Sequence, residues 1–176
     1  MSKSVKIVID ADVVIHFIKG ESLHLLPRIF PAYKYVILDE LLNKELRNNY
    51  STRLYLDNLM QYFPELLSVI KWDPDYEMMR EFSILHEKFG LVESMSLAYC
   101  KFNHDVVASS NITEITNYCE ENDIQYITTM DFIWQAYITK LMSEEESNTF
   151  SRMVIDKGSK LPCKRIKDFK PRELHL

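Results

Sequence analysis

The sequence contains only three glycines, Gly20, Gly90 and Gly158, and they lie far apart. Loops that cradle the phosphates of a nucleotide need closely spaced glycines, as in the Walker-type loop or the GxGxxG turn of dinucleotide-binding proteins. Neither motif can be written with the glycines of this chain. We therefore expect no nucleotide-binding loop of either type.

Long hydrophobic runs are also missing. No apolar run approaches the roughly 18 residues of a membrane-spanning helix, and Asp10 interrupts the first apolar segment too early for a signal peptide. The three cysteines, Cys100, Cys119 and Cys163, are odd in number and widely spaced. This usage suits buried thiols in a reducing cytosol better than a disulfide framework or a zinc site. We expect a cytoplasmic protein without a membrane segment.

Positive charge is scarce over most of the chain. The net charge is −5, which is not typical of a protein that binds nucleic acid with its whole surface. Cations nevertheless gather near the C-terminus, where residues 157–172 contain one acid, Asp168, and these seven cations: Lys157, Lys160, Lys164, Arg165, Lys167, Lys170 and Arg172. Such a segment can contact RNA phosphates, and we take Lys164, Arg165 and Lys167 as candidates. A tail that is solvated or docks on its own domain is the alternative.

Strand-like and helix-like segments alternate along the 176 residues. Strands are predicted at 5–11, 35–38, 67–72, 105–110 and 124–129. Helices are predicted at 12–20, 39–49, 51–63, 73–90, 91–103, 112–122, 131–142 and 143–155. This order predicts an α/β fold, with a small parallel sheet of about five strands flanked by helices on both faces. We divide the chain into an α/β domain, 1–156, and a basic tail, 157–176.

Two acids interrupt the most hydrophobic stretch of the chain. Asp10 follows the first strand, and Asp12 follows two residues later. In parallel sheets, ligands bind beyond the carboxyl ends of the strands, so this is where a functional carboxylate is expected. An acid at this position can equally be the N-cap of the next helix. The pattern favours Asp12 as the cap, which leaves Asp10 for chemistry.

Two further acids are candidates for the same site. Glu45 comes three residues after Leu42 and four after Leu41, which predicts that it lies on the inward side of its helix. A carboxylate there is costly unless it meets a cation; the alternative is a rim residue that reaches solvent. Glu93 opens the helix after Gly90, where the helix dipole alone would favour an acid.

Carboxylates that converge at a sheet edge repel one another unless a cation neutralises them. Oxygen ligands without a cluster of His or Cys favour Mg²⁺ or Mn²⁺, and such an ion can orient water for attack on a phosphodiester. The five histidines are scattered and no G-x-S-x-G motif is present. The sequence therefore offers no other convincing catalyst.

Three segments together resemble PIN domains, a family of metal-dependent nucleases with a small parallel α/β sheet. These are "VIDADVVIHF", "ILDELLNKEL" and "GLVESMSLAYC", and residues 105–142 follow the closing layout of the family. The resemblance implies that Asp10, Glu45 and Glu93 hold Mg²⁺ or Mn²⁺ and carry out the cleavage of RNA. It also implies two partners, because many members are toxins inhibited by an antitoxin protein and many form homodimers. Helix 51–63 offers an apolar dimer face: Leu54, Leu59, Met60, Tyr62 and Phe63.

One position departs from the family pattern. The family usually has Asp where this chain has Ser110 and Asn111. Both residues can ligate a hard cation through oxygen, and we include them as candidate metal ligands, but neither brings a negative charge. Asp131, after the fifth strand, is a candidate substitute. The alternative function is a catalytically weakened or inactive PIN-like module that binds RNA or protein.

Overall fold

The computed structural model describes residues 5–174, apart from the side chains at positions 112 and 114. Five strands form one parallel sheet in the order β3-β2-β1-β4-β5. Their bounds are β1 Lys6–Ile9, β2 Lys34–Leu38, β3 Ser68–Ile70, β4 Val106–Ala108 and β5 Tyr126–Ile127. The α/β fold with a five-stranded parallel sheet that the sequence predicts is confirmed.

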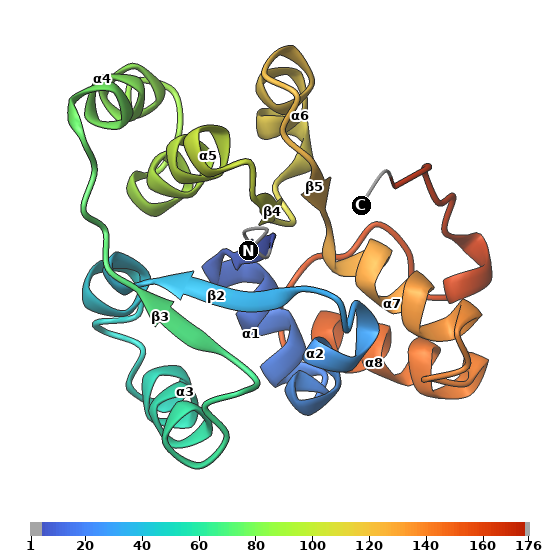
Figure 1. Cartoon of the computed structure of the whole chain (residues 1–176). Coiled ribbons are helices and arrows are strands. Elements are labelled where there is room, and N and C mark those ends of the chain that lie inside the picture. Colours follow the sequence, from blue (N-terminus) through green and yellow to red (C-terminus); the bar gives the residue numbers. More distant parts are fainter. Residues whose placement is uncertain (1–4, 175–176) are drawn as a thin grey trace.

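Helices connect the strands (Figure 1). Their bounds are α1 Ala11–Lys19, α2 Leu26–Ile29, α3 Tyr50–Tyr62, α4 Tyr76–Leu85, α5 Leu91–Asn103, α6 Ile112–Glu121, α7 Thr129–Ile138 and α8 Glu144–Asp156. Two short 3₁₀ turns add to them, η1 Leu23–Leu25 and η3 Ile166–Asp168. Every strand predicted from the sequence is present, and α5 has the predicted bounds.

The central strand β1 supplies side chains to two separate hydrophobic clusters. Ile7 and Ile9 belong to a cluster with residues of α1, α2, α7 and α8. Val8 belongs to a second cluster with residues of α4, α5 and α6. This alternation follows from the two-residue period of a strand. It explains why the run before Asp10 is continuously apolar.

The predicted helix 39–49 is instead a short π-helical segment, η2 Leu41–Glu45. The Leu46 N–H donates to the Leu41 carbonyl, at 3.0 Å, so this turn is wider than an α-helical one. Leu41 and Leu46 are both buried as a result, and Glu45 is exposed. The prediction that Glu45 lies on the inward side is wrong, because in the wide turn Leu46 is the residue that packs into the core.

The predicted helix 73–90 is shorter at both ends. The Asp75 carboxylate accepts a hydrogen bond from the Met78 N–H, at 2.9 Å, and thus fixes the start of α4 after the Asp-Pro segment. The helix ends at Leu85, and Gly90 is the N-cap residue of α5 rather than the end of α4.

The basic tail packs on the domain as far as the structure describes it, which leaves out residues 175–176. Ile166 is fully buried, and its N–H donates to the Asn148 side chain of α8, at 2.8 Å. The Phe169 ring lies beside Trp134. Residues 157–174 therefore form a docked tail and not a solvated one. The division at residue 156 stays a prediction.

The helices of the described chain, residues 5–174, are all too short or too polar to cross a lipid bilayer.

Candidate carboxylate site at the sheet edge

Asp10 lies where β1 ends and α1 begins. Its N–H donates to the Ala108 carbonyl at the end of β4, at 2.9 Å. Its carboxylate accepts a 2.8 Å hydrogen bond from the Ala11 N–H, which makes Asp10 the N-cap residue of α1. The prediction that Asp12 is the cap is wrong, because α1 starts directly after the strand. Asp10 is buried all the same, so its carboxylate sits in the protein at the carboxyl edge of the sheet.

Asp12 lies in the first turn of α1 and binds two backbone N–H groups. One carboxylate oxygen accepts from Val13, at 2.6 Å. The other accepts from Ser110, at 2.8 Å, in the loop that follows β4. Asp12 therefore ties α1 to the end of the neighbouring strand and holds its charge at the same edge as Asp10.

Glu45 reaches this edge from η2. Its carboxylate accepts a hydrogen bond from the Val92 N–H, in the first turn of α5. The side chain is exposed as a whole, yet partial desolvation raises the pKa of its carboxyl, and the charge of Asp12 raises that pKa further. The Glu45 carboxylate is therefore accessible to solvent and also near enough to Asp12 to feel its charge.

Glu93 belongs to the same first turn of α5 and is buried. Its charge acts on Asp10 and helps to raise the pKa of that group. At the carboxyl edge of the sheet, Val92 therefore supplies an N–H group to Glu45, and Glu93 supplies a further carboxylate. The dipole at the start of α5 favours both.

Four acids, from three separate stretches of the chain, interact at this edge. Burial raises the pKa of Asp10 well above its usual range, and the charges of Asp12, Glu45 and Glu93 raise it further. Burial also raises the pKa of Asp12. The three acids predicted from the sequence are thus brought into electrostatic contact. Asp12 is a fourth acid that sequence reasoning set aside as a cap; its position two residues after Asp10 was the available signal.

The donor set fits a hard divalent cation, because every acid of the site offers carboxylate oxygen. As the side chains stand, however, no three His, Cys, Asp or Glu among the described residues are placed to hold one metal ion. The acids are close enough to raise the pKa of Asp10 without converging on a single point. The fold therefore gathers the acids at one edge but does not by itself form a coordination geometry.

The Ser110 hydroxyl lies within hydrogen-bond distance of two other side chains. Its Oγ lies 2.6 Å from the Thr129 hydroxyl and 3.4 Å from Nδ1 of His16. The Thr129 hydroxyl in turn lies 2.9 Å from the same His16 nitrogen. Burial, and secondly Lys19, lower the pKa of His16 to about 4. A neutral imidazole and two hydroxyls therefore form a polar network between α1, α7 and the loop after β4.

The other residues predicted near the site have different surroundings. Asn111 is exposed at the start of α6, and its N–H donates to the Ser109 hydroxyl, at 3.2 Å. Asp131 is buried in a capping box with Thr128, and it pairs with Arg172, at 3.1 Å. The hypothesis that Asp131 substitutes for the missing acid is not supported, because its carboxylate already caps α7 and binds a cation.

The three predicted RNA-binding cations lie on the tail and differ in their surroundings. Arg165 forms an ion pair with Asp168, at 2.9 Å, and Lys167 forms one with Glu144, at 2.7 Å. Lys164 lines a cleft between the tail and α8.

Comparison with known proteins gives no assignment. No protein-family model matches the chain, and neither does any curated protein or solved structure. The likeness to PIN domains therefore rests on the three segments quoted above, together with the order and spacing of the elements.

Proposed function

We propose that this protein is a metal-dependent ribonuclease with a PIN-like fold. The observation that carries the proposal is the place of the buried Asp10 at the carboxyl edge of the sheet, with Asp12 bound beside it to the loop after β4 and with Glu45 and Glu93 near enough for their charges to raise the pKa of Asp10. A buried carboxylate among three other acids is costly in the absence of a counter-charge. A cation that binds among these acids would offset their repulsion and raise the free energy of unfolding.

Asp10, Glu45 and Glu93 would hold Mg²⁺ or Mn²⁺, with Asp12 beside them. A bound ion would polarise the scissile phosphate and lower the pKa of a bound water. Asp10 would bring a positioned carboxylate, because the Ala11 N–H holds it, and a bound cation would favour its ionised form. Glu45 is exposed and has a raised pKa, which suits a group that takes the proton from the attacking water. The bond from phosphorus to the leaving ribose oxygen breaks as the new P–O bond forms, and the leaving oxygen takes a proton from solvent.

A second candidate function is a PIN-like module that binds RNA or protein without cleaving it. Two observations favour it: Ser110 and Asn111 bring no charge where the family usually has Asp, and the Ser110 hydroxyl is engaged with Thr129. Loss of one carboxylate weakens the attraction for a divalent cation without removing it. Metal binding and cleavage, measured separately, distinguish the two functions.

Two measurements test the nuclease. Mn²⁺ should raise the melting temperature of the protein, and Asp10→Asn should abolish that rise. The protein should cleave a mixed-sequence single-stranded RNA in Mn²⁺, and Glu45→Gln should lower the rate by roughly 10²-fold or more, as expected for loss of a general base. Glu65→Gln is the matched control, because Glu65 is an exposed acid outside the cluster. Mn²⁺ binding without cleavage would favour the second function, and absence of both would refute the metal site.

The proposed partners are RNA, an antitoxin-like protein and a second copy of the chain. The predicted dimer face on α3 is divided. Leu59 and Met60 pack against the hydrophobic core, whereas Leu54, Tyr62 and Phe63 are exposed. These three side chains are the ones available for a homodimer contact, which stays a prediction.

A further inference from the structure

The docked tail forms one wall of a cleft, and α8 forms the other. The cleft has a volume of roughly 1420 Å³. Arg152 lines it from α8, and Lys160 and Lys164 line it from the tail. Leu161 and Pro162 also line it, and so do the acids Glu144, Glu145 and Asp168, so its surface is partly apolar and carries charges of both signs.

Ion pairs neutralise only some of the cations in this region. Arg165 pairs with Asp168 and Lys167 with Glu144. Within residues 5–174, Arg152, Lys160 and Lys164 have no ion pair. The cleft therefore carries three positive charges without a carboxylate partner, on a protein whose net charge is −5.

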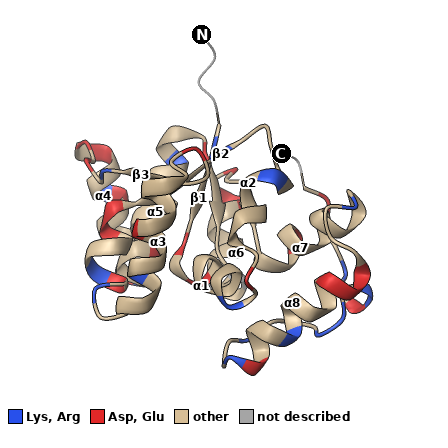
Figure 2. Ribbon diagram, turned by 90° about the horizontal axis from the view of Figure 1, so that it is seen from below, with Lys and Arg blue, Asp and Glu red and all other residues tan. Residues whose placement is uncertain are grey.

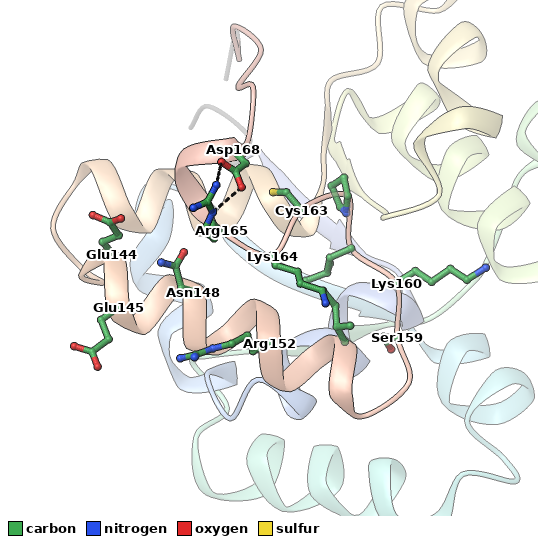
Figure 3. A pocket seen from close by; sticks show the side chains of 13 residues that line it. Glu144, Glu145, Asn148, Arg152, Ser159, Lys160, Cys163, Lys164, Arg165 and Asp168 are labelled. Carbon is green, nitrogen blue, oxygen red and sulfur yellow. Dashed lines mark hydrogen bonds and ion pairs between the residues drawn. The ribbon is translucent and has the colours of Figure 1, made fainter.

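The charges are also separated along the cleft. Figure 3 shows Arg152 and Lys164 near its middle, whereas Glu144 and Glu145 project from the first turn of α8 at one end. In Figure 2, red residues mark the start of α8, and blue segments of the tail lie beside them. An anion that enters the middle of the cleft thus meets cations first.

The cleft is built before any ligand arrives. Burial of Ile166, and its hydrogen bond to Asn148, fix the tail near the cleft. Farther along, Arg172 pairs with Asp131 and lies over the Tyr126 ring, 3.6 Å from its centroid. A preformed wall lowers the ordering cost of binding. The position of the cations is therefore a property of the folded protein.

We propose that this cleft binds single-stranded RNA, with Arg152, Lys160 and Lys164 on the phosphates and bases against Leu161 and Pro162. Each nucleotide presents an anionic phosphate beside a flat apolar base, which matches a surface of cations and aliphatic side chains. The choice of RNA over another polyanion rests on the proposed nuclease function. The cleft replaces the tail as a whole as the RNA-binding site, because two of the three predicted tail cations have internal partners.

Binding is tested without cleavage. Fluorescence anisotropy with a labelled oligouridylate in EDTA measures affinity while no divalent metal is present. The double variant Arg152→Gln/Lys164→Gln should weaken binding about 10-fold and reduce the slope of log K against log salt by about 1.4, since each phosphate contact on a single strand contributes about 0.7. Arg28→Gln/Lys170→Gln removes the same charge from exposed positions outside the cleft and should change affinity less than about 2-fold.

Two further measurements make the test specific. Lys167→Gln should weaken binding less than Lys164→Gln does, because Lys167 is already paired with Glu144. Affinity is measured in EDTA, where no metal-dependent cleavage occurs, so a failure of the nuclease proposal leaves this result intact. Oligouridylate containing 4-thiouridine should crosslink under light to the segment 152–164.

Three results would overturn the proposal. The first is an equal loss of affinity in the cleft variant and in the Arg28/Lys170 control, and the second is no binding at all. The third is displacement of the RNA by polyglutamate at a comparable concentration of charge, which would assign the cleft to an acidic protein. All the substituted cations are exposed, and an unchanged melting temperature verifies that each of these variants is folded.

Discussion

The backbone N–H of Ser110 donates a 2.8 Å hydrogen bond to the Asp12 carboxylate, across 98 positions of sequence. This bond joins the first turn of α1 to the loop after β4, so it holds together the segments that follow the neighbouring strands β1 and β4. Ser110 therefore serves the site through its backbone, while its hydroxyl bonds to Thr129. The backbone of Ser110 thus holds another acid of this edge in place.

The acid cluster predicts a pH-dependent difference in stability between the natural sequence and Asp10→Asn. The folded protein raises the pKa of Asp10, so its favourable contribution is complete below the unfolded value and is lost as pH rises through the folded value. In EDTA, the natural sequence should therefore lose stability relative to Asp10→Asn as pH rises, and the variant should be the more stable protein at high pH. Urea unfolding across a pH series measures this difference.

The natural sequence has to be compared with Asp10→Asn, because His16 also makes the stability of each protein depend on pH. Its pKa is lowered from 6.5 to about 4, so its contribution is present above 6.5 and is lost as pH falls toward 4. That trend opposes the one from Asp10, and it occurs in both proteins, so the difference cancels it. A difference that does not change with pH would contradict the raised pKa of Asp10.

Thr129→Val should destabilise the protein by about 1–3 kcal/mol, because the loss of this hydroxyl leaves the buried His16 without the hydrogen bond that it makes there. Thr139→Val is the matched control. The Thr139 hydroxyl donates to the Gln135 carbonyl at the exposed end of α7, and its loss should cost about 0.5 kcal/mol or less. Equal costs in urea unfolding would show that the network contributes nothing.

Gly20→Ala should destabilise the protein by about 1–3 kcal/mol through overpacking. A Cβ at this position would lie 2.2 Å from the Phe150 ring, so α1 and α8 would have to separate. At Gly90 an added Cβ meets nothing within 4 Å, and Gly90→Ala should change the free energy of unfolding by about 0.5 kcal/mol or less. If both variants melt alike, the contact between Gly20 and Phe150 is not a constraint.

Arg172→Ala should release the end of the tail from β5. The variant loses an ion pair to a buried carboxylate and the contact with the Tyr126 ring, at an expected cost of about 1–2 kcal/mol. Amide hydrogen exchange should become faster in residues 166–174 and in β5. Lys170→Ala, an exposed neighbour, should leave both regions unchanged, and equal protection in the two variants would contradict the anchoring role.

The exposed side chains of Leu54, Tyr62 and Phe63 predict that two copies of the chain associate. Light scattering should give twice the mass of one chain, and the double variant Tyr62→Glu/Phe63→Glu should give the monomer, because charges in place of exposed aromatic side chains oppose burial. A natural sequence that scatters as a monomer at high concentration would refute the homodimer.

The order of strands and helices follows from the sequence because hydrophobic periodicity is local. Val106 and Val107 predict a buried strand without knowledge of its neighbours, and α5 begins and ends where its pattern does. The same argument placed Asp10 at a strand end. An acid at the carboxyl end of a parallel strand is a candidate for function on topology alone.

Hydrogen-bond geometry decided two local features that hydrophobic periodicity does not predict, the type of turn at residues 41–46 and the cap of α1. The spacing of Leu41, Leu42 and Glu45 fits an α-helix, but a wider turn buries Leu46 and turns Glu45 outward. The backbone leaves β1 so abruptly that Asp10 is itself the cap. Both outcomes depend on how a segment meets its surroundings, which periodicity does not encode.

Only the tertiary structure decided which polar groups meet. Asp12 binds Ser110 across 98 positions, and Asp131 binds Arg172 across 41. The second contact removes Asp131 from the acid cluster and docks the tail that forms the cleft. The sequence by itself determined the sheet and most of its helices, because burial patterns repeat at short range. The pairing of charges was decided by the fold, because it depends on distances in space between segments that the sequence keeps far apart.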